Sequence, residues 1–222
     1  MNRYLATFKS AFLLAIENEK VTKNPFRKVK LQKENNTRVR FLTEDEEARL
    51  FKAIPSQWHA PMLVALHTGM RFGKQMRLRW EDIDFKQELL TVMESKSGSA
   101  RHVPLNQIAV STLRAIPRRL NCPWVFYNDE ASMRQQLPRQ WEGLAEAKIE
   151  NFHWHDLRHT FASRLVMAGV DLYAVKELLG HHSIEMTQRY AHLAPSHLKQ
   201  AVEALVSQKQ VTPELTPAEN TA

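Results

Sequence analysis

Cysteine is almost absent from this sequence of 222 residues, since Cys122 is the only one. A single thiol excludes an intramolecular disulfide and suits a reducing compartment, so we interpret Cys122 as a small buried hydrophobic residue. The sequence also has no apolar run of about 20 residues, the length that crosses a bilayer. Lys9 and Glu17 bracket the first apolar stretch, which is not the pattern of a signal peptide. These absences predict a cytoplasmic protein with no membrane partner.

Acidic residues are scarce at the start of the chain, where residues 1–40 hold ten Lys or Arg and three Asp or Glu. The remainder is balanced, so this segment accounts for the whole net charge of +7. A basic segment is either a solvated linker or a binding surface for a polyanion such as nucleic acid. The candidate DNA-binding side chains are Lys23, Arg27, Lys28, Lys30, Arg38 and Arg40.

Apolar spacing divides the chain into an N-terminal helix and a larger domain. A single helix cannot bury its own apolar face, so we predict that residues 1–40 are the last helix of another domain and a basic linker. Thr43 and Glu46 form a capping-box pattern that opens a compact domain over residues 41–193. The C-terminal residues 194–207 form a short amphipathic pattern, and the polar residues 208–222 are expected to be disordered.

The predicted fold class of residues 41–193 is mostly α with a small antiparallel β-sheet (α+β). Residues 89–105 alternate in hydropathy around a loop that contains Gly98, which predicts a β-hairpin with Lys96 near its tip. Helical spacing predicts further elements at residues 58–68, 71–79, 106–116, 131–147, 155–168, 171–178 and 183–190.

Cationic and imidazole side chains are spread over this domain together with one tyrosine of interest. If the fold gathers them, their charge calls for an anionic partner such as a phosphodiester, because unpaired buried charge is costly. Taken singly, each has an ordinary interpretation as a solvated, structural or core-edge residue. The candidate catalytic residues are Arg71, Lys96, His155, Arg158, His181 and Tyr190.

Zinc is the competing interpretation of the histidines. His155 and His159 are four residues apart, as on a zinc-binding helix. However, Asp156 occupies the position where the His-Glu-x-x-His pattern has Glu, and no cysteine pair is available. We therefore predict no metal and no cofactor.

The motifs TGMR, HDLRHTFASRLVMAGV and LLGHHSIEMTQRYAHL, with Lys96 between the first two, resemble the catalytic domain of the tyrosine recombinase (phage integrase) family over about residues 41–193. The N-terminal helix and linker resemble the end of that family's preceding core-binding domain, which implies a truncated or fragmentary copy of it. The resemblance implies a bacterial or phage-encoded, nucleoid-associated enzyme that acts on double-stranded DNA and takes no small-molecule substrate. It also implies a tetramer on DNA, in which residues 194–207 can be exchanged between protomers.

The resemblance further implies a role for each candidate residue. Tyr190 attacks a DNA phosphodiester, forms a covalent 3′-phosphotyrosine link and releases a 5′-hydroxyl, and the reverse step rejoins the strands without ATP or metal. Arg71 and Arg158 clamp the phosphate, while Lys96 protonates the leaving oxygen. The family pattern implies that His155 helps accept the tyrosine proton, His181 hydrogen-bonds the phosphate, and His159 gives structural support.

Lys74 departs from the family pattern, which usually has Glu or Asp three residues after the first arginine. Without this carboxylate we expect a looser pocket, slower cleavage and a faster enzyme on substitution of Lys74 by Glu. Two alternatives remain open at this point. The chain is either an active recombinase or a weakly active or inactive DNA-binding remnant of one, with a type IB topoisomerase as a weaker third interpretation.

Overall fold

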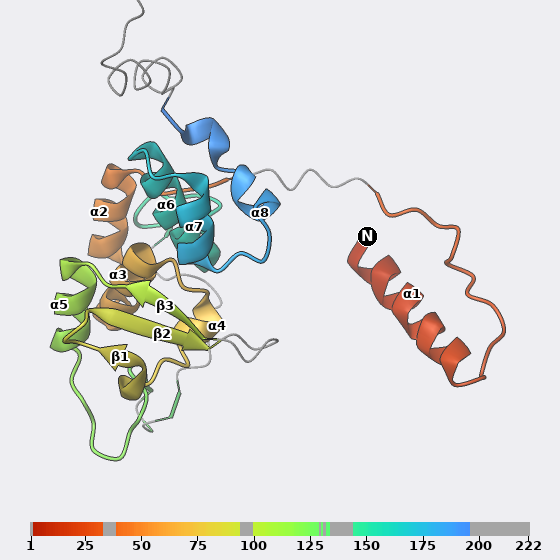
Figure 1. Ribbon diagram of the computed structural model, residues 1–222, viewed down its shortest axis with the longest axis horizontal. Helices are drawn as coiled ribbons and strands as arrows, with labels where there is room; N and C mark the ends of the chain where they lie inside the picture. Colours follow the sequence, from red (N-terminus) through yellow and green to blue (C-terminus); the bar gives the residue numbers. More distant parts are fainter. Residues whose placement is uncertain are drawn as a thin grey trace, which may run out of the picture. The chain divides into compact units, whose positions relative to one another are not determined.

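The computed structural model describes residues 2–32, 39–93, 100–128, 130, 132–133 and 144–195. The chain divides into two compact units, Met1–Arg38 and Val39–Ala222 (Figure 1). The sequence predicts a division after residue 40, whereas the structure places Val39 and Arg40 in the second unit.

The first unit consists of helix α1 (Asn2–Glu17) and the chain that returns along it. Phe26 stacks on Phe8 and contacts Phe12, with ring centroids 5.4 and 5.5 Å apart. The Asn2 side chain donates to the carbonyl oxygen of Gln32 at 2.7 Å and accepts from its backbone N–H at 2.8 Å. A segment without hydropathic periodicity is therefore still held on the predicted helix, although no described residue of α1 is fully buried.

The second unit combines helices with a three-stranded antiparallel sheet, which confirms the predicted fold class. The sheet has the order β1-β2-β3, with Ile83 paired to Leu90 and Val92 to Arg101. The helices and strands of the second unit are α2 (Glu44–Ala53), η1 (Ser56–Trp58), α3 (His59–Thr68), α4 (Phe72–Gln75), η2 (Trp80–Asp82), β1 (Ile83–Asp84), β2 (Leu89–Met93), β3 (Ala100–Pro104), α5 (Gln107–Ala115), α6 (Trp154–Met167), α7 (Leu172–Leu179), α8 (Glu185–Gln188) and η3 (Ala191–Leu193).

Helix α3 is the centre of the main core, since it packs against both α5 and α6. Met62, Val64 and Ala65 on this helix are completely buried. Burial of each larger apolar side chain is worth about 1.5–3 kcal/mol. A second, smaller cluster joins α6 to α7, and the ring of Tyr190 belongs to it with 1% of its surface exposed.

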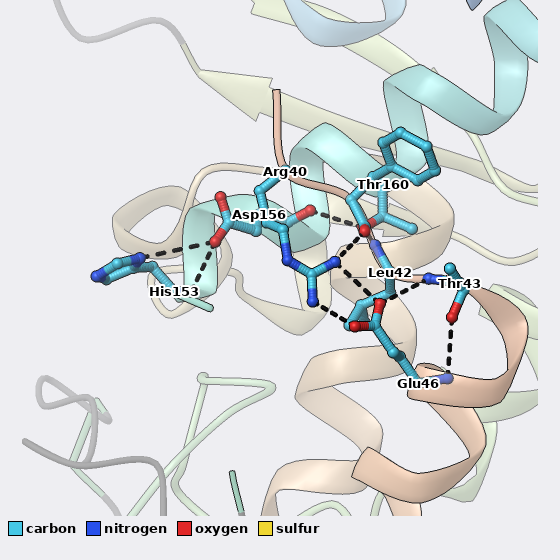
Figure 2. A network of polar contacts seen from close by, with 8 residues as sticks. Arg40, Leu42, Thr43, Glu46, His153, Asp156 and Thr160 are labelled. Atoms are coloured by element: carbon cyan, nitrogen blue, oxygen red, sulfur yellow. Dashed lines mark hydrogen bonds and ion pairs between the residues drawn. The ribbon is translucent and has the colours of Figure 1, made fainter. Parts of the chain in front are cut away.

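A polar network fixes the start of α2 (Figure 2). The Thr43 side chain accepts from the Glu46 backbone N–H at 3.2 Å, and the Glu46 carboxylate accepts from the Thr43 N–H at 3.0 Å, which confirms the predicted capping box. The same carboxylate receives both ends of the Arg40 guanidinium, at 2.9 and 2.6 Å.

The same network extends to the start of α6. The Leu42 backbone N–H donates to the Thr160 hydroxyl at 2.9 Å, and that hydroxyl donates to the carbonyl oxygen of Asp156 at 2.7 Å. The Asp156 carboxylate in turn accepts from the His153 backbone N–H at 2.7 Å (Figure 2). Helix α6, which carries the candidate catalytic residues His155 and Arg158, is thereby anchored at its N-terminus.

Three sequence expectations differ from the structure. The helix predicted over 71–79 ends at Gln75, because the backbone of Leu78 and Trp80 hydrogen-bonds to residues 123–125 instead. The sequence does not predict the two-residue strand β1. Residues 132–133 and 144–148 form a bend, a bridge and turns rather than the predicted helix 131–147, whose centre lies outside the described residues.

Other expectations concern burial and the chain end. Cys122 is buried, with 6% of its surface exposed, as predicted. None of the described helices is long and apolar enough to cross a bilayer. Of the predicted helix 194–207, only residues 194 and 195 are described, and the predicted tail 208–222 lies outside the described residues.

Candidate active site

The turn that follows α3 presents Arg71. Gly69 ends α3 in the left-handed conformation, with φ 61°. A Cβ atom at this position would lie 2.5 Å from the Phe161 ring, so both the backbone and the space require glycine. Arg71 then adopts an extended backbone as the N-cap of α4, and its side chain reaches the candidate site.

Helix α6 supplies a second arginine at the centre of the site. The Arg158 guanidinium is buried, with 2% of the residue exposed. It donates from Nη1 to the carbonyl oxygen of Gly69 at 2.6 Å and from Nη2 to that of Leu179 at 2.7 Å. One side chain thus joins the C-terminal ends of α3 and α7, and its position is set by main-chain atoms of both.

His181 follows the end of α7 directly. Gly180 ends this helix with φ 63°, and the His181 backbone N–H donates back to the Lys176 carbonyl at 3.1 Å. The His181 ring lies 2.8 Å through Nδ1 from the hydroxyl of Thr187, which is completely buried in α8. The imidazole is therefore held from both the backbone and the ring.

Tyr190 lies against His159 and not against His155. The phenolic oxygen is 2.6 Å from Nδ1 of His159. The His155 ring also contacts His159, edge to face, with centroids 4.9 Å apart. The sequence predicts only a supporting role for His159. The signal for direct contact with the tyrosine was its position four residues after His155, which places both histidines on one face of the helix.

These side chains enclose one pocket of about 120 Å³. Among the described residues, no carboxylate lines this pocket. Its lining residues are Arg71, His155, Arg158, His159, His181, Met186, Arg189 and Tyr190, so five of the six predicted catalytic residues meet here together with Arg189, which the sequence did not single out.

Burial and mutual repulsion keep the imidazoles neutral. Burial, and then the His155 ring, lower the pKa of His159 to about 4. Burial, and then the guanidinium groups of Arg158 and Arg71, lower the pKa of His181 to about 3. The pKa of His155 is lowered by burial first and by Arg158 second. At neutral pH the positive charge of the pocket therefore resides on its arginines.

The nucleophile candidate is protonated in this state. Burial raises the pKa of Tyr190, and the nearby charges of Arg158 and Arg189 oppose that rise. Because the phenol keeps its proton and His159 is neutral, the short contact between them suits donation by the hydroxyl to Nδ1. The pocket thus combines a neutral acceptor, a phenol and several guanidinium groups.

Two lysines that the sequence singles out lie outside this pocket or outside the described residues. Lys96 falls within residues 94–99, which are not described. The Lys74 ammonium donates to the carbonyl oxygen of Met93 at the end of β2, at 2.5 Å. Lys74 is therefore bound to the backbone of the sheet and does not line the pocket.

The predicted DNA-binding side chains have different surroundings. Four of them are exposed in the first unit: Lys23, Arg27, Lys28 and Lys30. Arg38 lies outside the described residues. Arg40 is held by the Glu46 carboxylate and faces the Phe152 ring at 5.8 Å, so it has structural contacts, and its predicted DNA contact stays a prediction.

Metal-binding geometry is also absent from what the structure describes. Within the described ranges, no group of three or more His, Cys, Asp or Glu side chains is arranged to hold a metal ion.

Comparison with known proteins gives the site its context. Residues 40–197 match the model of the phage integrase family. The integrase of Salmonella phage P22 is 36% identical over 210 residues, which cover 86% of this chain and 54% of that protein. The tyrosine recombinase XerA of Pyrococcus furiosus is 34% identical over 173 residues, 73% of this chain and 60% of that protein. The chain therefore spans little more than half the length of these relatives.

A solved structure agrees with these matches. The catalytic domain of bacteriophage HP1 integrase superimposes with a TM-score of 0.60 and 30% identity, covering 75% of this chain and 95% of that domain. The similarity therefore extends over nearly the whole of a known integrase catalytic domain.

Proposed function

Because this chain belongs to the phage integrase family, we propose that it cuts and rejoins DNA strands at specific sites through a covalent 3′-phosphotyrosine intermediate on Tyr190. The observation that carries the proposal is the Tyr190 hydroxyl 2.6 Å from His159, in a pocket that Arg71 and Arg158 also line. A nucleophile, a proton acceptor and guanidinium forks are the groups that phosphoryl transfer requires.

The bonds balance without a cofactor. The Tyr190 oxygen forms a bond to phosphorus and its proton leaves, while the bond from phosphorus to the 5′-oxygen breaks and that oxygen gains a proton. In the second step a 5′-hydroxyl attacks the phosphotyrosine, and the phenol is released again. Each step exchanges one phosphoester for another, so no external energy source is needed.

Arginine charge supports the transition state. Arg71 and Arg158 line the pocket in which the non-bridging oxygens would gain charge, and no described carboxylate lines it to neutralise them. Removal of one such donor typically costs on the order of 10²–10³ in rate. The two carbonyl oxygens that bind Arg158 orient its guanidinium but are uncharged, so the full positive charge of this side chain still acts on the phosphate.

His159 is the proposed first acceptor of the tyrosine proton, and the His155 ring is in contact with His159. A pKa of about 4 makes His159 a weak base in the free protein. The phosphate brings negative charge among the cations, which raises the pKa of both imidazoles and lowers the cost of taking up the proton. DNA binding thus prepares the base, while His181 remains a hydrogen-bond donor to the phosphate.

Several family properties rest on the resemblance alone. Lys96 would protonate the leaving 5′-oxygen, residues 194–207 would link protomers in a tetramer on double-stranded DNA, and the protein would act on DNA in the cytoplasm. Exposed Lys23, Arg27, Lys28 and Lys30 support the DNA contact by their charge.

A nicked suicide substrate tests the chemistry. Cleavage near the nick releases a short strand and leaves the protein covalently attached, which denaturing gels resolve as an adduct. We expect the wild-type chain to form this adduct and Tyr190→Phe to abolish it. An adduct that survives this substitution would show that another residue is the nucleophile.

A DNA-binding remnant is the second candidate function. It is favoured by the burial of Tyr190, which has 1% of its surface exposed in the free protein. This alternative predicts weak, salt-sensitive binding without any covalent adduct. Adduct formation by the wild-type chain excludes it.

A further inference from the structure

Two consecutive carbonyl groups at the end of α7 are each bound by a different arginine. Arg158 donates to the carbonyl oxygen of Leu179, and Nη1 of Arg101 donates to that of Leu178. The last carbonyls of a helix lack partners within the helix and carry the negative end of its dipole, so cations stabilise them. Arg158 belongs to the pocket, whereas Arg101 comes from β3 and has no place in the proposed mechanism.

Arg101 also covers the residue that ends the helix. A Cβ atom at Gly180 would lie 2.6 Å from Nε, 2.9 Å from Cδ and 3.0 Å from Cζ of Arg101. The guanidinium therefore lies directly on the Gly180 backbone, which leaves no room for a side chain. The positive φ of 63° independently favours glycine here.

His181 is the next residue in the chain. Its backbone is fixed by the turn that Arg101 covers, and its ring is fixed by the Thr187 hydroxyl at 2.8 Å. Loss of the covering guanidinium would free the Gly180 turn and expose the backbone behind the imidazole to water. Of the two arginines, Arg158 would then remain at the end of α7.

We propose that Arg101 is a positioning residue that holds His181 and the end of α7 in the active arrangement. It acts through the carbonyl oxygen of Leu178 and the backbone of Gly180, without contact to the reacting phosphate. The inference rests on the proposed function for its effect on cleavage, but its effect on His181 is independent of activity.

Single-turnover cleavage of the nicked substrate tests the first consequence. Arg101→Met is expected to lower the cleavage rate roughly tenfold to a hundredfold, the range that small misplacements produce, with little change in non-covalent DNA binding. Arg101→Lys should not restore the rate, because an ammonium cannot both cover Gly180 and reach Leu178 as the planar fork does. Rescue by Lys, or a loss confined to binding and its salt dependence, would mean that Arg101 contacts DNA and would overturn the proposal.

NMR titration of the His181 imidazole in the free protein tests the second consequence. The groups that act on this ring are Arg158, Arg71, Arg189 and His159, with burial as the largest influence. In Arg101→Met we expect the pKa of His181 to rise from about 3 toward its ordinary value of 6.5, because water reaches the ring. An unchanged pKa with an unchanged cleavage rate refutes the positioning role.

Two further variants separate local from general effects. Gly180→Ala leaves Arg101 in the chain but displaces its guanidinium, so it should reproduce both changes. Arg118→Met removes an arginine of the same domain that stacks on Trp80 at 4.4 Å, outside the pocket, and should leave both the cleavage rate and the pKa of His181 unchanged.

If wild type forms no adduct, the proposed function fails while the titration still decides the role of Arg101. If Arg101→Met does not fold, Arg101→Lys and Gly180→Ala carry the same two measurements.

Discussion

Nη1 of Arg158 donates to the carbonyl oxygen of Gly69 at 2.6 Å, across 89 positions of sequence. One proposed catalytic arginine is thus fixed by the backbone of the turn that presents the other one, Arg71. The two guanidinium groups cannot be displaced independently, since a change in the turn moves the anchor of Arg158.

Gly69→Ala is expected to destabilise the fold by at least about 1–3 kcal/mol, because an alanine at φ 61° is strained and its Cβ meets Phe161. Chemical denaturation measures this loss. Gly73→Ala is the matched control: nothing lies within 4 Å of its Cβ, so stability should stay equal or rise by about 0.5–1 kcal/mol. Equal effects of both substitutions would contradict the requirement at Gly69.

His159→Asn is expected to lower single-turnover cleavage on the order of 10²–10⁴-fold, since Asn can hydrogen-bond Tyr190 but cannot take its proton. His155→Asn should have the smaller effect, because this ring contacts His159 and not the phenol. DNA binding is measured alongside and should change little. A larger loss at His155 would return the acceptor role to that residue.

Stability should fall as the pH is lowered below about 6.5. His159 and His181 have folded pKa values of about 4 and about 3, below the ordinary 6.5, so the unfolded chain binds more protons in this window. Each contributes stability that is present above pH 6.5 and is lost as pH falls toward the folded pKa, at up to about 1.4 kcal/mol per pH unit. Urea unfolding at pH 7 and pH 5 measures the slope.

His181→Asn should flatten this dependence by the share of one histidine. A slope that is identical in wild type and His181→Asn would mean that the imidazole is solvated in the folded protein.

Lys74→Glu is expected to slow cleavage a few-fold. The sequence alone predicts the opposite, because a carboxylate would supply the anion that the pocket lacks. In the structure, however, the Lys74 ammonium donates to the Met93 carbonyl, and a carboxylate there would repel that oxygen. Lys74→Arg keeps a donor and should stay near wild type. Faster cleavage by Lys74→Glu would restore the original expectation.

Replacement of Lys23, Arg27, Lys28 and Lys30 by Ala should weaken DNA binding at low salt. The slope of log Kobs against log salt should fall by about 0.9 for each phosphate that these side chains neutralise in the wild-type complex. Arg40→Ala should instead lower the thermal stability and leave the slope unchanged, because its guanidinium is bound to Glu46. A reduced slope for Arg40→Ala would place that residue in the DNA interface.

Much of the fold follows from local pattern. Three features depend on residues that are close in sequence, and the structure has them where the sequence predicts them. They are the capping box at Thr43, the buried helix α3 and the β2–β3 pairing. The failures arise where distant segments compete with local preference. Residues 78–80 continue a helical spacing but pair with residues 123–125, which are remote in sequence.

The candidate site, like the fold, was predicted only in part. The resemblance of the motifs to the family singles out Arg71, His155, Arg158, His181 and Tyr190, and the fold brings them into one pocket. Spacing does not reveal which histidine touches the phenol, because His155 and His159 lie on the same face of α6. Spacing also does not reveal the backbone partners of Arg158, Arg101 or Lys74, because every residue has a main-chain carbonyl group and the residue type does not identify the acceptor.

Burial of Tyr190 in the cluster between α6 and α7 has a consequence for genome integrity. A protein that meets DNA at random carries a hazard, because each unintended attack leaves a broken strand with protein attached. With 1% of its surface exposed, the Tyr190 side chain is almost entirely shielded from solvent in the free protein. Under the proposed function, the packing around the phenol has to loosen before it attacks, so strand cleavage would be confined to complexes with DNA that last long enough for this rearrangement.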